Sequence, residues 1–179
     1  MKEFLAPKGG LAALQPSTRL ALALFLVFAL LGYGVMIALG VARSGLDVTS
    51  IREYYGGSTP ELAKSTGELL ELTHFHLFAM PMQLFVLGHV FLLGRYSQRW
   101  RRWIVVAAFA GAACDLAAPW LVQAAGESGA WVKLAGRLLL APSLMLMILV
   151  PLLELLRLSS SPARATPPQG QGDAHTGSS

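Results

Sequence analysis

Four long apolar stretches, separated by polar segments, set the pattern of the chain. They cover residues 20–41, about 69–93, 104–122 and about 132–156. A helix needs about 20 apolar residues to cross the hydrocarbon core of a bilayer, and strands are much shorter than these stretches. The first stretch is also too long for the apolar part of a signal peptide. The pattern therefore predicts an all-α protein, an integral membrane up-down bundle of four transmembrane helices.

The polar segments divide the chain into a transmembrane domain, residues 19–158, and two flanking regions. Residues 1–18 form a short N-terminus. Residues 159–179 form a tail rich in Ser, Pro, Gly and Gln, which has too few apolar residues to fold and is expected to be disordered.

The outer loop, residues 43–68, is longer than a simple helical hairpin requires. Ser58 or Thr59 followed by Pro60 predicts a short helix that begins at Pro60 and continues through Glu68 into the second span. Two interpretations of this segment stay open. It is an amphipathic cover on the membrane surface, or it is a docking site for a partner.

Composition excludes an ordinary soluble domain. Hydrophobic residues make up 54% of the 179 residues and charged residues only 13%, about half the share of a typical soluble protein. The net charge of +4 does not indicate binding to nucleic acid, because the basic residues are dispersed in short segments beside the apolar stretches. One cysteine, Cys114, cannot form a disulfide within the chain.

The distribution of Lys and Arg predicts the orientation. Nine of them lie in the two termini and the loop between the second and third spans, and five lie on the opposite side. Since cytoplasmic loops carry the excess of positive charge, both termini are expected in the cytoplasm, and the lipid bilayer is the expected surrounding of the four spans.

Three of the four histidines lie in the second apolar stretch. They are His74, His76 and His89, and Glu71 lies beside them. Ionisable groups are costly in hydrocarbon, usually face the interior of a bundle, and often mark a functional site. At about 100° per residue, Glu71 and His89 lie at the same angle around the helix axis, and His74 lies close to that angle. His76 points to a different side of the helix. We expect these rings to face the bundle interior.

This helix resembles the haem-carrying helices of membrane b-type cytochromes, in which two histidines of one helix, spaced like His76 and His89, each ligate a haem near one membrane face. The resemblance implies a b-type haem bound by His74 or His76 near the outer face and by His89 near the inner face. It covers one helix, and no second helix of the chain supplies histidines. A methionine or a second copy in a homodimer would complete the ligands. Arg137 is the candidate contact for a haem propionate.

The chain also resembles small four-helix proteins of the bacterial inner membrane with a Thr-His-x-His element, here Thr73 to His76, after an acidic periplasmic loop. This resemblance implies a multi-pass protein of the bacterial inner membrane and carries no known activity.

Two other interpretations of the histidines remain open. Glu71, His74 and His76 are candidate ligands of a small metal ion, because a carboxylate and an imidazole three residues apart lie on one helix face. Alternatively, the histidines are structural and hydrogen-bond neighbouring helices.

The other ionisable groups within the spans are Asp115, Arg137 and Glu154. Arg137 is expected to pair with Glu71 or Asp115, because a lone charge in this position would be uncompensated. The functional hypothesis is a small membrane subunit that binds haem or metal and passes electrons between the quinone pool and a periplasmic redox partner. The alternatives are a non-catalytic assembly or anchor subunit and a proton-coupled transporter.

Overall fold

The computed structural model describes residues 10–59 and 63–160. The expectations for residues 1–9 and for the tail from 161 onward lie outside this part of the chain. The described elements follow one another as η1 (Gly10–Ala13), α1 (Pro16–Ser44), α2 (Val48–Gly56), α3 (Thr66–Leu92), α4 (Gln98–Ala125) and α5 (Glu127–Ser160).

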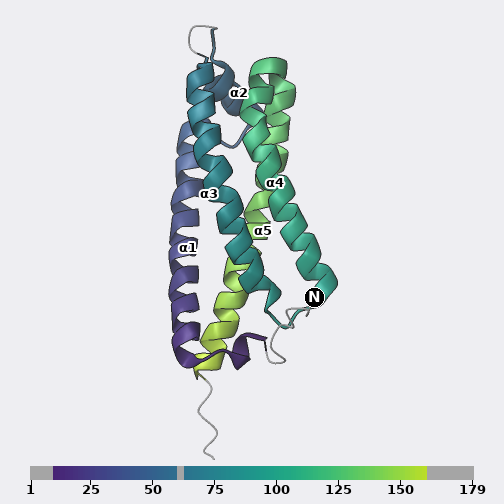
Figure 1. Cartoon of the computed structure of the whole chain (residues 1–179). Coiled ribbons are helices and arrows are strands. Elements are labelled where there is room, and N and C mark those ends of the chain that lie inside the picture. Colours follow the sequence, from purple (N-terminus) through teal and green to yellow (C-terminus); the bar gives the residue numbers. More distant parts are fainter. Residues whose placement is uncertain (1–9, 60–62, 161–179) are drawn as a thin grey trace, which may run out of the picture.

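The long helices α1, α3, α4 and α5 run side by side as a bundle, with α2 at one end (Figure 1). Within residues 10–59 and 63–160 these four helices are the ones long and apolar enough to cross a membrane. The predicted all-α bundle of four spans is confirmed. We call the end that holds α2 the outer end and the end where α1 begins and α5 finishes the inner end, after the predicted orientation.

The outer loop folds differently from the prediction. The short helix of this loop is α2, which ends at Gly56, and residues 63–65 are not helical. Asp47 starts α2 by accepting a hydrogen bond from the backbone N–H of Ser50, and Ser65 and Glu68 form a capping box that starts α3. The prediction that the helix continues through Glu68 into the second span is wrong, because residues 63–65 are not helical and Ser65 caps a new helix start. The predicted start at Pro60 lies outside the described residues.

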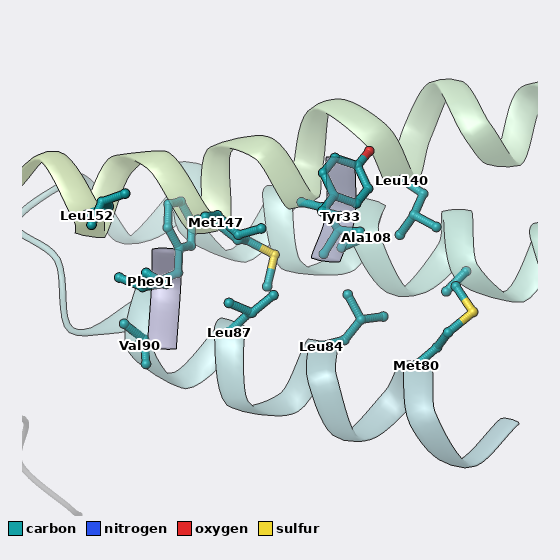
Figure 2. Packing of buried hydrophobic residues seen from close by; sticks show 14 of the residues in the cluster. Tyr33, Met80, Leu84, Leu87, Val90, Phe91, Ala108, Leu140, Met147 and Leu152 are labelled. Atoms are coloured by element: carbon teal, nitrogen blue, oxygen red, sulfur yellow. The ribbon is translucent and has the colours of Figure 1, made fainter. Parts of the chain in front are cut away.

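The main core fills the bundle along α3, α4 and α5. Figure 2 shows Met80, Leu84 and Leu87 of α3 pointing toward the neighbouring helices, with Met147 of α5 directed at Leu87. From α1, Leu26 and Tyr33 reach this core, and most of its other side chains point away from the bundle. The helices α3 to α5 thus form the packed centre, and α1 lies along one side of it.

A second, smaller core forms at the outer end. Ile51 and Tyr55 of α2 pack against Leu69 of α3, Val122 of α4 and Ala130 of α5. The amphipathic helix of the outer loop therefore covers the ends of three spans through its apolar side.

The closest approach in the bundle is between α4 and α5. A Cβ atom added to Gly111 would lie 2.6 Å from the backbone nitrogen of Leu140, and one added to Gly136 would lie 2.9 Å from that of Asp115. Only residues without a side chain let two helix backbones approach this closely.

Candidate functional site

The structure places the three histidines on different sides of α3. His74 and His89 are exposed on the side away from the bundle, and His76 is half-buried. The buried side of α3 carries Leu84 and Leu87. The expectation that the rings face the bundle interior is therefore wrong for His74 and His89, because the side of the helix that carries Leu84 and Leu87 packs inward.

Two of the imidazoles are held by their own helix. Nδ1 of His76 lies 2.8 Å from the carbonyl oxygen of Leu72, and Nδ1 of His89 lies 2.8 Å from that of Phe85. Because a carbonyl only accepts, each Nδ1 carries the hydrogen and donates it, and Nε2 of the neutral ring is then an acceptor. The ring of Phe85 also contacts the ring of His89, with centroids 4.1 Å apart.

The candidate metal ligands do not converge. Glu71 and His74 are exposed, and His76 lies on another side of the helix. Among residues 10–59 and 63–160, no three His, Cys, Asp or Glu side chains lie close enough together to hold a metal ion. A cavity of about 450 Å³ opens at the start of α4, and its lining comprises Gln98, Arg99, Arg102, Trp103 and Val106 rather than histidines. This cavity therefore does not involve the three histidines of α3.

A buried ion pair joins α4 to α5 below α2. The ammonium of Lys133 lies 2.9 Å from the carboxylate of Asp115, and the two side chains are 7% and 19% exposed. The same ammonium donates to the backbone carbonyl of Asp115 at 3.0 Å and lies 5.4 Å from the ring centroid of Tyr55. Lys133 is one of the five basic residues on the side opposite the termini, and the sequence did not single it out as a partner for Asp115. Its place within the apolar stretch 132–156 was the signal that it needs a partner.

Arg137 has a different role from the two predicted for it. Its guanidinium donates to the carbonyl oxygen of Gly45 at 2.7 Å and to the hydroxyl of Ser44 at 2.6 Å. The predicted pairing with Glu71 or Asp115 is wrong, because Asp115 is taken by Lys133 and the guanidinium lies at the C-terminal end of α1. A cation there satisfies free carbonyls and interacts favourably with the helix dipole.

A comparison with family models places most of this chain in a known group. The model of the Aq_1264_TM family, a transmembrane helical domain, matches residues 45–162. The chain belongs to this family. No curated protein and no solved structure matches the sequence.

The part that matches the Aq_1264_TM family comprises α2 to α5 and leaves α1 outside. It contains the outer core, the ion pair of Lys133 with Asp115, and the histidines of α3. It also contains a hydrogen bond from Trp120 of α4 to the hydroxyl of Thr73 of α3, at 2.9 Å. Of the polar contacts described above, only the hydrogen bond of Arg137 to Ser44 reaches outside the matched residues. The description of the family supports a membrane protein.

Tyr55 provides a pH-dependent probe of the α2 contact. Burial, followed by the negative charge of Asp115, raises the pKa of Tyr55 to about 12. Folding therefore stabilises the protonated phenol. We expect the stabilisation to be complete below about pH 10, the ordinary pKa of tyrosine, and to be lost as the pH rises from about 10 to 12.

The measurement is the near-ultraviolet absorbance of phenolate during an alkaline titration of the protein in detergent, with Tyr55→Phe as the reference. The difference between the two titrations should show one tyrosine that ionises late. A difference curve centred at the ordinary pKa of tyrosine would contradict the buried position of this ring.

Proposed function

We propose that the protein is a membrane assembly subunit that binds another transmembrane helix through the outward side of α3. One observation carries the proposal: Glu71, His74 and His89 lie exposed on that side, within a span. In hydrocarbon, Nε2 of His89 would lack a hydrogen-bond partner, because only Nδ1 is bonded within the helix. Polar groups in this position usually contact another helix.

The outward side of α1 differs from that of α3 in the kind of residue that it exposes. Its exposed side chains include Leu24, Phe28, Leu31 and Val35, at 52–73% exposure, and none of these is ionisable. Such a surface suits lipid tails. The difference between α1 and α3 is therefore in chemistry rather than in exposure.

The test compares two sets of substitutions on the two outward sides. We expect the combined variant Phe85→Ala and His89→Ala to reduce the size of the complex extracted from membranes in mild detergent, because it removes side chains that bind the partner helix. Phe28→Ala on α1 is the matched control, because Phe28 is 73% exposed against 60% for Phe85, and it should leave the size unchanged. The size is measured on a native gel or by light scattering. A wild-type protein that is a monomer under these conditions would overturn the proposal.

A second candidate is the b-type haem subunit of an electron-transfer chain in the bacterial inner membrane, working between the quinone pool and a periplasmic partner. It is favoured by the His89 ring, whose Nδ1–H is bonded to Phe85 so that Nε2 is free to act as a ligand. Arg137, held by Gly45 and Ser44, does not fit as a propionate contact for such a haem. A haem would have to lie between α3 and a second protein.

An optical spectrum separates the two candidates. If the protein holds a b-type haem, the dithionite-reduced protein shows its alpha band, and His89→Ala removes or shifts that band. If the spectrum of the purified complex shows no haem, the assembly role stands without electron transfer. Phe28→Ala is the control, because this exposed side chain of α1 has no part in either proposal, and it should leave the spectrum unchanged.

A further inference from the structure

The cavity at the start of α4 lies at the inner end of the bundle (Figure 1). All the residues that line it come from α4, and they are Gln98, Arg99, Arg102, Trp103 and Val106. At about 100° per residue, they lie on the opposite side of the helix from Ala108 and Gly111, which are buried in the bundle. The cavity, which we call the α4 cavity, therefore opens outward, toward the surroundings of the protein.

Two arginines bring uncompensated positive charge to the α4 cavity. Arg99 and Arg102 are exposed, and neither forms an ion pair within residues 10–59 and 63–160. The chain from residue 72 to 114 contains no Asp or Glu that could pair with them locally. Arg101 lies on another side of α4 and donates to the backbone carbonyls of Leu92 and Gly94. The guanidinium donors of the two arginines in the cavity are thus available to an anion.

The polar and apolar residues of the α4 cavity follow a fixed order along the helix axis. Gln98 and the two arginines come first, and Trp103 and Val106 lie further into the span, with Val106 about 12 Å from Gln98 at 1.5 Å per residue. Trp103 is 67% exposed and Val106 is 55% exposed. An outward tryptophan at the end of a span is typical of the headgroup level of a bilayer. Hydrogen-bond donors therefore lie at the membrane surface, and apolar side chains lie toward the hydrocarbon.

We propose that the α4 cavity binds an anionic phospholipid from the leaflet at the inner end. The guanidiniums of Arg99 and Arg102 donate to its phosphate oxygens, a contact for which the planar donor set of arginine is suited. The upper part of an acyl chain lies along Trp103 and Val106. Basic pockets on the cytoplasmic side of membrane helices bind such headgroups, and the distribution of Lys and Arg predicts that side for this end.

The order of residues favours a lipid over a soluble anion. A soluble phosphate would contact the same arginines and leave Trp103 and Val106 unused, whereas a phospholipid matches both ends of the cavity. A zwitterionic lipid carries its own cation beside the phosphate, so a lipid with a net negative charge gains more from two unpaired guanidiniums. This site lies on a different helix from the outward side of α3 and does not depend on the proposed function.

Native mass spectrometry of the full chain tests the proposal. The protein is released from nanodiscs that contain equal amounts of phosphatidylglycerol and phosphatidylcholine, and the lipids that stay bound are identified. We expect several-fold enrichment of phosphatidylglycerol on the wild-type protein. Arg99→Gln or Arg102→Gln should bring the bound lipids close to the equal mixture of the bilayer, because each variant removes a direct contact with the phosphate.

Arg95→Gln is the matched control. Arg95 is an exposed arginine of the same loop, its loss changes the charge by the same amount, and it does not line the α4 cavity. The variant should keep most of the enrichment, because salt at physiological strength screens a charge that is further than about 8 Å from the phosphate. Circular dichroism of each variant in detergent checks that the helices remain folded.

Four outcomes would overturn the proposal. Absence of enrichment on the wild-type protein would show that the cavity does not select anionic lipid. Equal losses in all three variants would show that the loop attracts lipid through its total charge and not through the cavity. Release of the bound phosphatidylglycerol by millimolar inorganic phosphate would assign the cavity to a soluble anion. Its release by a peptide of Asp and Glu would assign the cavity to an acidic segment of a protein.

Discussion

Replacing Lys133 with methionine is expected to lower the free energy of unfolding by about 3–5 kcal/mol, the usual cost of removing one partner of a buried ion pair. The substitution leaves the carboxylate of Asp115, 19% exposed, without the ammonium that lies 2.9 Å away. It also removes the donor to the backbone carbonyl of Asp115. The measurement is unfolding in mixed detergent micelles, followed by tryptophan fluorescence.

The double variant Lys133→Met and Asp115→Leu is the control for this prediction. Two apolar side chains of similar volume leave no uncompensated charge, so most of the lost stability should return. If the double variant is as unstable as the single one, the loss reflects packing of the side chains rather than the unpaired charge. If Lys133→Met changes the stability by less than about 1 kcal/mol, the pair is solvated like a surface salt bridge.

Gly111→Leu is expected to destabilise the protein by about 3 kcal/mol, at the upper end of the usual cost of overpacking a core. The new side chain would have to enter the contact with α5, where a single Cβ already lies 2.6 Å from the backbone of Leu140. The helices α4 and α5 would be forced apart, and the Lys133 ion pair between them would be disturbed. The same unfolding measurement, together with circular dichroism, reports the effect.

Gly34→Leu on α1 is the matched control, because a Cβ at Gly34 would meet no atom within 4 Å. Its stability should stay the same or rise by up to about 1 kcal/mol, since leucine favours a helix more than glycine does. An equal loss at Gly34 and Gly111 would show that the effect comes from the helices themselves and not from the α4–α5 contact.

The outer end of the bundle connects these predictions. Lys133, Asp115 and Tyr55 lie together beneath α2, and Arg137 joins α5 to the end of α1. These contacts fix α2 and the end of α1 to the helices α4 and α5. The outward side of α3, which we propose as a binding surface, lies along the length of the span. Substitutions on that side and in the ion pair should therefore act independently on stability.

The sequence by itself determined the number of spans, their approximate limits and the shared azimuth of Glu71 and His89. These follow from the length of apolar runs and from helix geometry, which are local properties. It did not determine which side of α3 packs inward. In a transmembrane helix both the packed side and the lipid side are apolar, so hydrophobic periodicity does not distinguish them. Only the packing of Leu84 and Leu87 against the other helices turned His74 and His89 outward.

The partners of the charged groups were likewise decided by the tertiary structure. The sequence identified Asp115 and Arg137 as groups that need compensation, but the choice of Lys133 for Asp115 and of the α1 end for Arg137 depends on how α4, α5 and α1 are placed side by side. A charge in an apolar surrounding contacts whichever opposite charge or carbonyl the packing places close to it. Which group that is depends on how the helices assemble, so no single stretch of sequence determines it.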